Sequence, residues 1–226
     1  MKRYWALAQM PLPRNEDAVL YDERDGRECD GRELVFAQHC LDALRELGEL
    51  SRIRSRKRVL DVGSGRGALV AMLNKEGSSN YWCIDPQPIK KPLWPVMQCS
   101  LSGMREGGLF DYVMAWHVLE HTMDPVKFIR DMIKAVAPGG RIIIATPNAD
   151  SLMARKNWRC KEIFHTYLVG QKLLSEIIED NGFQIIKKMT WGGFPAPRKW
   201  WQNVANKILK WIGSGDVQLI IAGGKG

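Results

Sequence analysis

A short apolar run that ends in three closely spaced glycines limits most strongly what this chain can fold into. The run is VLDV at residues 59–62, and Gly63, Gly65 and Gly67 follow it. Glycine lets the backbone turn tightly and lets a ligand approach closer than a Cβ would permit. A helical pattern begins directly after the loop. These residues therefore predict a buried strand that turns through a ligand-binding loop into a helix.

Strand-like and helix-like patterns alternate along the rest of the chain, and no internal repeat is visible. This alternation predicts an α/β fold with a mostly parallel sheet and helices on both faces. The last two strands have no clear helix of crossover length between them, which allows an antiparallel hairpin at the C-terminal edge. The predicted strands are 58–62, 80–84, 95–99, 110–115, 141–146, 183–189 and 217–222, and the predicted helices are 66–76, 124–136 and 170–181.

The first 56 residues precede this alternation and differ from it in pattern. Residues 1–30 look irregular, whereas Glu33 to about Leu50 place their apolar side chains on one side of an amphipathic helix. We therefore predict two parts. Residues 1–56 form an N-terminal extension whose helix packs on the core or caps the site, and residues 57–226 form the main domain.

Composition sets the class of protein. The chain has 226 residues and 45% hydrophobic content, enough for one well-buried core. It lacks the roughly 20-residue apolar stretch that crosses a bilayer, and its start lacks a signal-peptide core. Five scattered cysteines without a C-x-x-C pair argue against a disulfide framework or a zinc knuckle. These features predict a cytoplasmic protein whose cysteines are small buried hydrophobes.

The net charge of +8 is unevenly spread along the chain. Residues 1–50 hold 7 Lys and Arg against 11 Asp and Glu, and the remainder holds 26 against 14. A basic body of this kind attracts nucleic acid, anionic lipid or an anionic substrate. Charge alone identifies none of these partners, and no specific nucleic acid is expected. The oligomeric state is left open.

The glycine loop taken alone is ambiguous. Gly63-x-Gly65-x-x-Ala68 satisfies a relaxed dinucleotide fingerprint, and Asp85 ends the next predicted strand near the expected distance. A nicotinamide-dependent oxidoreductase is therefore one alternative. Against it, Asp61 lies inside the strand, where a dinucleotide-binding strand usually carries an apolar residue. A carboxylate there can instead hold an ammonium group.

Two further segments follow in order, FDYVMAWHVLEH at 110–121 and APGGRIIIATPN at 137–148. Together with the glycine loop and its two acidic residues, they resemble the class I S-adenosylmethionine-dependent methyltransferases. The likeness is greatest to the branch that contains the ubiquinone-biosynthesis O-methyltransferases. It covers roughly residues 57–225 and implies a Rossmann-like sheet of seven strands with an antiparallel C-terminal edge hairpin.

The resemblance also implies a cofactor, S-adenosylmethionine, and residues that hold it. In the resembling family, the glycine loop binds the methionine end of the cofactor, and the carboxylate that ends the second strand binds the ribose hydroxyls. Residues near position 100 contact the adenine, and the residues after the fourth strand lie over the sulfonium. The family often has an acidic residue near position 100, and this chain has none there. The implied cofactor-binding residues are Asp61, Gly63, Ser64, Gly65, Asp85, Pro86, Ser100, Leu101, Trp116 and His117.

The implied reaction is in-line displacement of a methyl group from the sulfonium to a small-molecule, lipid or sugar acceptor. Oxygen is favoured as the acceptor atom because the resembling branch is rich in O-methyltransferases. A hydroxyl acceptor benefits from a base, and His117 and His165 are the candidate catalytic residues. Each histidine could instead only form structural hydrogen bonds. A second alternative function is a catalytically silent methyltransferase-like scaffold or membrane-associated binding protein.

The segment His117-x-x-Glu120-His121 matches the inverted zincin signature. A zincin needs both histidines on one helix face, whereas His117 falls in the loop after a strand. Some ubiquinone O-methyltransferases resemble this segment with E-x-x-E-H, a set associated with a divalent metal, but a histidine at the first position weakens an all-oxygen site. We therefore expect no metal, and expect Glu120 and His121 to cap the start of the following helix.

An aromatic and basic insertion separates the last two strands. Residues 191–213 carry several tryptophans and lysines and no acidic residue, and a helix is expected from about residue 198. A basic helix that bears tryptophan fits a membrane surface, so peripheral membrane contact through 198–212 is one interpretation. A lid over the substrate pocket is the other, favoured by similar insertions in the resembling family. Nucleic-acid stacking is a third without a supporting motif.

Overall fold

The computed structural model describes residues 32–75, 77–104, 109–155, 167–192 and 200–224. They form a seven-stranded sheet with the order β3-β2-β1-β4-β5-β7-β6. β7 pairs antiparallel with β5 and with β6, and the other pairs are parallel. This confirms the predicted Rossmann-like α/β fold. The strands are β1 (Arg58–Val62), β2 (Asn80–Asp85), β3 (Val96–Gln98), β4 (Phe110–Trp116), β5 (Val136–Pro147), β6 (Phe183–Trp191) and β7 (Val217–Gly224).

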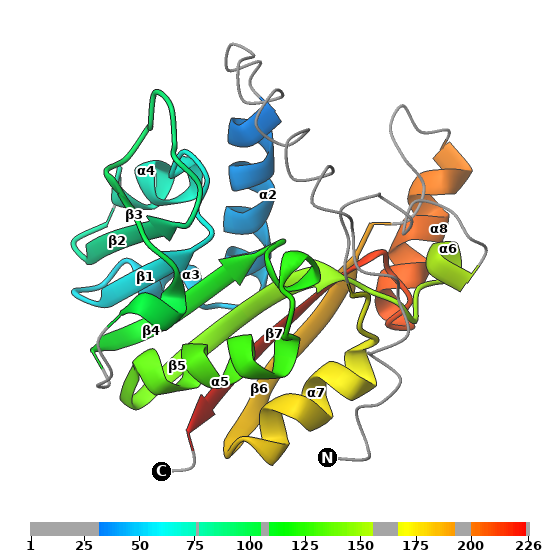
Figure 1. Ribbon diagram of the computed structural model, residues 1–226. Helices are drawn as coiled ribbons and strands as arrows, with labels where there is room; N and C mark the ends of the chain where they lie inside the picture. Colours follow the sequence, from blue (N-terminus) through cyan, green and yellow to red (C-terminus); the bar gives the residue numbers. More distant parts are fainter. Residues whose placement is uncertain (1–31, 76, 105–108, 156–166, 193–199, 225–226) are drawn as a thin grey trace, which may run out of the picture.

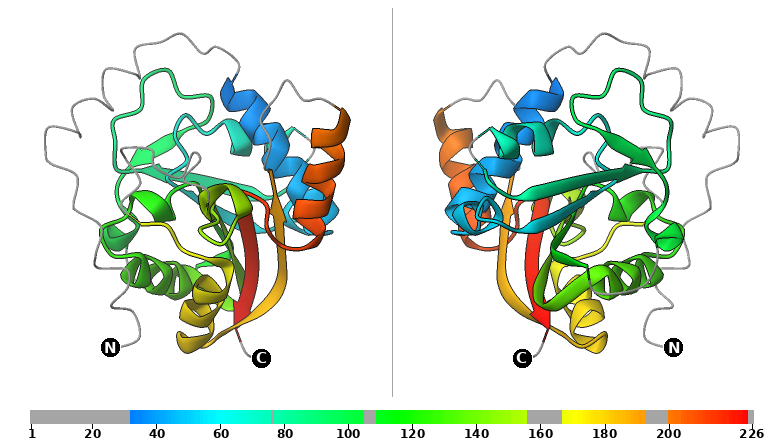
Figure 2. Two further views of the ribbon diagram at one scale, coloured as in Figure 1. Left: turned by 90° about the vertical axis from the view of Figure 1, so that its right-hand side faces the viewer. Right: turned by 90° about the vertical axis from the view of Figure 1, so that its left-hand side faces the viewer.

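Helices cover both faces of the sheet, as Figures 1 and 2 show. One core layer lies between one face of the sheet and the apolar sides of helices α2 (Arg32–Glu46), α3 (Leu50–Ile53) and α4 (Ala68–Asn74). The other lies between the opposite face and helices α5 (Pro125–Ala135) and α7 (Gln171–Asp180). Because both faces are covered, the central strands are buried over most of their length rather than on alternate residues only, and most of their residues are apolar. The structure also contains helices α6 (Leu152–Arg155) and α8 (Trp200–Trp211), with 3₁₀ turns η2 (Leu101–Gly103) and η3 (Leu119–His121).

The main difference from the sequence prediction lies between α5 and β5. The Pro138-Gly139-Gly140 segment was expected to separate them, but β5 begins at Val136. Val136 pairs with Phe110, and the register shifts before Tyr112 pairs with Arg141. Extra residues on one strand of a pair are accommodated as a bulge, which a glycine with positive φ such as Gly139 permits.

The start of α5 corrects the capping role expected of Glu120 and His121. Asp124 is the N-cap, and its carboxylate accepts a hydrogen bond from the backbone N–H of Lys127 at 2.8 Å. Pro125 follows at the first helical position, where a missing N–H costs nothing. Glu120 lies before this cap in η3 and makes other contacts, which belong to the candidate site.

The N-terminal helix is tied to the sheet through a buried carboxylate. Glu49, between α2 and α3, is completely buried. It accepts hydrogen bonds from the Tyr112 hydroxyl on β4 at 3.1 Å and from the Arg141 guanidinium on β5 at 2.7 Å. Lys187 on β6 approaches the same carboxylate to 3.3 Å. Burial and the neighbouring Glu49 charge raise the pKa of Tyr112 to about 12, so the hydroxyl keeps its proton and donates.

Two expectations from composition can be compared with the structure. Cys40 and Cys83 are buried in one core layer and Cys99 is half-buried, whereas Cys29 and Cys160 lie outside the described residues. Burial raises the pKa of the Cys40 and Cys83 thiols, so they behave as small hydrophobes. Across the described ranges, no helix has the length and apolar character needed to cross a membrane.

Candidate active site

The glycine loop after β1 has the strained geometry that its composition predicts. Gly63, Gly65 and Gly67 all have positive φ, at 66°, 54° and 77°. A Cβ on Gly63 would lie 2.5 Å from Cγ2 of Val118, which follows β4. A Cβ on Gly65 would meet nothing within 4 Å. The loop therefore packs tightly against the neighbouring strand at its start and opens onto free space at its centre.

Asp61 brings a carboxylate into the central strand directly before this loop. It pairs with Cys83 on β2 and Met114 on β4, and it is 3% exposed. Burial, with a smaller contribution from the negative charge of Asp85, raises the pKa of Asp61 to about 7. A buried carboxylate of this kind is costly to ionise without a partner. A cationic ligand beside it would stabilise the ionised form, because an opposite charge lowers the pKa of a carboxyl group.

Asp85 ends the neighbouring strand and binds the loop itself. Its Oδ2 accepts a hydrogen bond from the backbone N–H of Gly65 at 3.0 Å, and its Oδ1 accepts one from Gln87 at 2.9 Å. The side chain is buried. Each carboxylate oxygen can accept more than one hydrogen bond, so acceptor capacity is left for a vicinal diol.

A cavity of about 190 Å³ opens at the loop, at the carboxyl ends of the central strands. Ligands of open α/β sheets bind in this position. The N-terminal helix α2 forms one wall of the cavity, where Glu33 lies 3.7 Å from the Arg66 guanidinium of the loop. The lining residues are Glu33, Phe36, Ala37, Asp61, Gly63, Ser64, Gly65, Arg66, Ala68, Leu69 and Trp116.

Trp116, the last residue of β4, lines the cavity and carries a buried donor. Its side chain is 6% exposed, and its Nε1–H has no hydrogen-bond partner within the part of the chain that the structure describes. An unpaired buried donor costs about 1–3 kcal/mol. Trp116 and Asp61 thus place a residue with an unpaired donor and a residue with a carboxylate acceptor in the lining of one small cavity.

His117 follows Trp116 and is held by a buried network. Its Nδ1 lies 3.0 Å from Oε1 of Glu120, whose Oε2 accepts a hydrogen bond from the Thr146 hydroxyl on β5 at 2.8 Å. The His117 ring also packs edge-on against Phe36 of α2, with centroids 5.5 Å apart. Within the described ranges no cluster of three or more His, Cys, Asp and Glu side chains could hold a metal ion.

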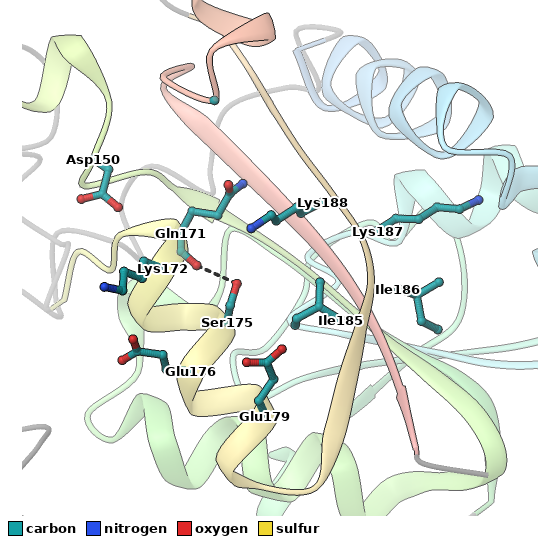
Figure 3. Close-up of a pocket in the computed structure, with 11 residues that line it drawn as sticks. Asp150, Gln171, Lys172, Ser175, Glu176, Glu179, Ile185, Ile186, Lys187 and Lys188 are labelled. Carbon is teal, nitrogen blue, oxygen red and sulfur yellow. Dashed lines mark hydrogen bonds between the residues drawn. The ribbon is translucent and has the colours of Figure 1, made fainter.

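A larger groove of about 720 Å³ lies elsewhere, between α7 and β6 (Figure 3). Three carboxylates and three lysines line it, and Figure 3 shows Lys187 pointing away from the others. The Lys187 ammonium group bonds to Leu47 and Glu49 instead. This groove contains none of the predicted site residues, and its charged walls lack the apolar surface typical of small-molecule sites.

Comparison with known proteins decides the family. A family model described as a methyltransferase domain matches residues 32–188, more than half of the chain. The chain belongs to this methyltransferase family. The match begins at α2, so the family model includes the helix that walls the cavity. The predicted resemblance to S-adenosylmethionine-dependent methyltransferases is confirmed.

Individual relatives of this chain agree with the family assignment. The chloroplastic tocopherol O-methyltransferase of Arabidopsis thaliana is 30% identical over 70% of this chain and 52% of that protein. The mitochondrial ubiquinone biosynthesis O-methyltransferase of Homo sapiens is 30% identical over 66% of this chain and 47% of that protein. The chain spans about half the length of these curated relatives.

A solved structure supports the fold of this chain. The 1,6-didemethyltoxoflavin-N1-methyltransferase of Burkholderia thailandensis, solved with 1,6-didemethyltoxoflavin and S-adenosylhomocysteine, superimposes with a TM-score of 0.62 at 16% identity. The superposition covers 96% of this chain and 92% of that one. At this identity the likeness establishes the architecture.

The structure brings together about half of the predicted cofactor-binding residues. The glycine loop, Asp61 and Trp116 line one cavity, and Asp85 contacts it through Gly65. Leu101 is buried in the other core layer, and Pro86 and Ser100 are exposed, with the Ser100 hydroxyl 3.1 Å from that of Ser102. These three do not line the cavity, nor does His117. His165 lies outside the described residues.

Sequence reasoning missed the site contacts of two groups of residues. Glu33 and Phe36 of α2 reach the cavity from the predicted extension, and only the general expectation of a capping helix pointed to them. Glu120 and Thr146 form the network behind His117. The sequence offered one signal for the contact between Glu120 and His117: the two polar residues lie three positions apart within an apolar segment.

Proposed function

We propose that this protein is an S-adenosylmethionine-dependent methyltransferase that transfers a methyl group to a hydroxyl oxygen of a small-molecule, lipid or sugar acceptor by in-line displacement. The observation that carries the proposal is the buried carboxylate of Asp61 beside a glycine loop and a cavity at the carboxyl ends of the strands. The O-methyltransferase names of the two curated relatives support oxygen as the acceptor atom.

The cofactor half of the proposal rests on the match between the cavity and a zwitterionic, adenosyl-bearing ligand. S-adenosylmethionine supplies a methyl group activated by its sulfonium when bound. Asp61 would hold the methionine ammonium group, and the indole N–H of Trp116 would donate to the carboxylate. The space beside Gly65 admits the ligand, and Asp85 would accept from the ribose hydroxyls. The remaining predicted contacts at Pro86, Ser100 and Leu101 stay proposals.

The acceptor half of the proposal assigns His117 as the base. As the acceptor oxygen forms its bond to the methyl carbon, the carbon–sulfur electron pair stays on sulfur and the hydroxyl proton passes to the imidazole. Removing such a base costs about 10²–10⁴-fold in rate. His117→Asn is the matching variant, because asparagine tolerates the positive φ of 54° at this position. His165 stays a second proposed base.

Calorimetry with S-adenosylhomocysteine tests the cofactor site. Binding is expected, and Asp61→Ala and Asp85→Ala should each weaken it about tenfold or more, since hydrogen bonds to charged groups contribute about 1.5–3 kcal/mol. Asp131→Ala, on the far end of α5, is the control and should bind like the wild type. An absence of binding, or wild-type affinity in both site variants, would refute the proposal.

Transfer of a tritiated methyl group tests the reaction itself. Catechol serves as the hydroxyl probe and aniline as the amine probe. Label in catechol that is lost in His117→Asn supports oxygen transfer, and label in aniline alone contradicts it. Cofactor binding without transfer to any acceptor, including a cell extract, would favour the silent scaffold instead.

We also propose that α8 is a surface for peripheral membrane contact. Its outward face exposes Val204, Ile208, Trp211 and Ile212, with Trp211 86% exposed. These positions recur at intervals of four, three and one residues, so they lie on one side of the helix. Lys207 is exposed beside them, and the helix carries no acidic residue. Apolar burial and attraction to anionic headgroups would act together. The lid role stays an alternative, and none of the cavity-lining residues comes from α8.

Co-sedimentation with liposomes tests this surface. Wild-type protein should sediment with vesicles that contain phosphatidylglycerol and less with neutral phosphatidylcholine vesicles. The double variant Trp211→Ala and Lys207→Ala should lose most of this binding. The control double variant, Met123→Ala and Lys127→Ala, removes one exposed apolar residue and one lysine elsewhere and should bind normally. Equal binding by both double variants would contradict the proposal.

A further inference from the structure

The carboxylate of Glu120 is a buried charge whose two oxygens have separate partners. The side chain of Glu120 is completely buried, and Thr146, which donates to Oε2 at 2.8 Å, is 2% exposed. The other oxygen lies 3.0 Å from Nδ1 of His117. A charge buried to this degree is stable only when it is fully hydrogen-bonded, so the contact with His117 is a constitutive part of the fold.

The protonation state of Glu120 decides which way this hydrogen bond runs. Burial raises the pKa of Glu120, but the hydrogen bond and charge of His117 and the hydroxyl of Thr146 outweigh it, and the pKa is lowered overall. An ionised carboxylate can only accept hydrogen bonds. The proton between the two groups therefore sits on Nδ1 of His117, which donates it to Oε1.

The backbone of His117 shows that this arrangement is imposed by the surrounding structure. His117 has a φ of 54°, a left-handed conformation that is unfavourable for a residue with a Cβ. Its N–H donates to the carbonyl of Ala145 on β5 at 2.8 Å. Two neighbouring strands, β4 and β5, thus hold the histidine backbone and its carboxylate partner in fixed relative positions.

We propose that Glu120 is a positioning residue that fixes His117 as the Nδ1–H tautomer and so presents the unprotonated Nε2 to the acceptor hydroxyl. This inference rests on the proposed function of His117 as the base. The hydroxyl proton goes to Nε2, the resulting imidazolium is stabilised by the Glu120 carboxylate, and the proton then leaves to solvent. Glu120 stays ionised throughout. The His117 side chain keeps 31% exposure, which leaves a path for the proton.

Nitrogen-15 NMR of histidine-labelled protein at a pH where the imidazoles are neutral tests the tautomer without any need for activity. The sequence has four histidines, and His117→Asn identifies the signal of interest. The wild type should show the Nδ1–H tautomer of His117. Glu120→Ala should show a mixture or the opposite tautomer, and Glu120→Gln, which keeps the shape and an acceptor oxygen, should retain the wild-type tautomer. An Nε2–H tautomer in the wild type, or no change in Glu120→Ala, would overturn the proposal.

Kinetics supply the second readout. Glu120→Ala should lower kcat by about 10–100-fold, the usual effect of a partner that orients a functional histidine, with little change in KM for S-adenosylmethionine. Glu120→Gln should recover part of kcat, and Glu179→Gln, on the exposed side of α7, should behave like the wild type. Wild-type kcat in Glu120→Ala refutes positioning while the proposed function stands. The expected tautomers without any methyl transfer refute the proposed function while positioning stands.

Discussion

The carboxylate of Glu49 and the guanidinium of Arg141 lie 2.7 Å apart although 92 positions separate the two residues in the chain. This contact joins the turn after α2 to the central strand β5. It holds α2, which walls the candidate cavity, in a fixed position on the sheet. A charge pair that does not line the cavity thus helps to position the helix that forms its wall.

Glu49→Ala should lower the free energy of unfolding by about 3–5 kcal/mol, because it leaves the partners of a buried charge uncompensated. Urea denaturation measures this change. Glu46→Ala is the matched control, since it removes an exposed carboxylate that pairs with Lys210 and should cost about 0–1 kcal/mol. Equal losses in the two variants would show that burial of the Glu49 network contributes nothing.

The raised pKa of Asp61 makes the stability of the ligand-free protein depend on pH. The folded protein holds a proton on Asp61 up to about pH 7, whereas the unfolded chain releases it near the ordinary aspartate pKa of 3.8. The contribution of this carboxyl to stability is therefore greatest at low pH and declines as pH rises towards 7. Relative to the wild type, Asp61→Asn should gain stability between pH 5 and pH 8. A difference in unfolding free energy that stays constant over this range would contradict the shift.

Cofactor binding should shift Asp61 from its protonated to its ionised form, because an ammonium group beside it stabilises the carboxylate. Binding of S-adenosylhomocysteine should then release a proton below pH 7, and the affinity should rise with pH until it levels off above about pH 7. Calorimetry in two buffers with different ionisation enthalpies detects the released proton. Asp61→Asn should remove this release. Proton uptake in the wild type would be incompatible with the proposed contact.

Substitutions in the glycine loop should separate conformational strain from crowding. Gly65→Ala should cost about 1–2 kcal/mol, from its positive φ alone, since a Cβ there meets no other atom. Gly63→Ala should cost about 1–3 kcal/mol more, because its Cβ would overlap Val118. Thermal unfolding measures both. Adding Val118→Ala to Gly63→Ala should recover part of the stability, and an absence of recovery would exclude crowding as the cause.

Trp116→Phe tests whether the unpaired indole N–H serves the ligand. The variant removes the buried donor and keeps most of the ring, so the ligand-free protein should be as stable as the wild type or slightly more stable. Affinity for S-adenosylhomocysteine should fall by about tenfold, the value of one hydrogen bond to a charged group. A loss of stability together with unchanged affinity would assign the indole a purely structural role.

The sequence alone determined where most strands and helices lie along the chain and where the glycine loop falls, because these depend on local patterns. An apolar run, positive-φ glycines and a carboxylate inside a strand are each visible in neighbouring residues, and Asp61 and Gly65 accordingly lie where the pattern predicts. The limits of the predicted helices 66–76, 124–136 and 170–181 differed by only one or two residues at each end. The cap of α5 comes from Asp124 and not, as expected, from Glu120 and His121.

Only the tertiary structure decided which distant groups meet. Glu33 and Phe36 reach the cavity because α2 packs against the sheet, and Thr146 reaches Glu120 because β4 and β5 are neighbours with a particular register. The direction inferred for the His117 hydrogen bond follows from these contacts, which lower the pKa of Glu120 although burial raises it. Such contacts depend on how the strands pair and on which side chains are shielded from water. Neither can be read from the spacing of residues along the chain.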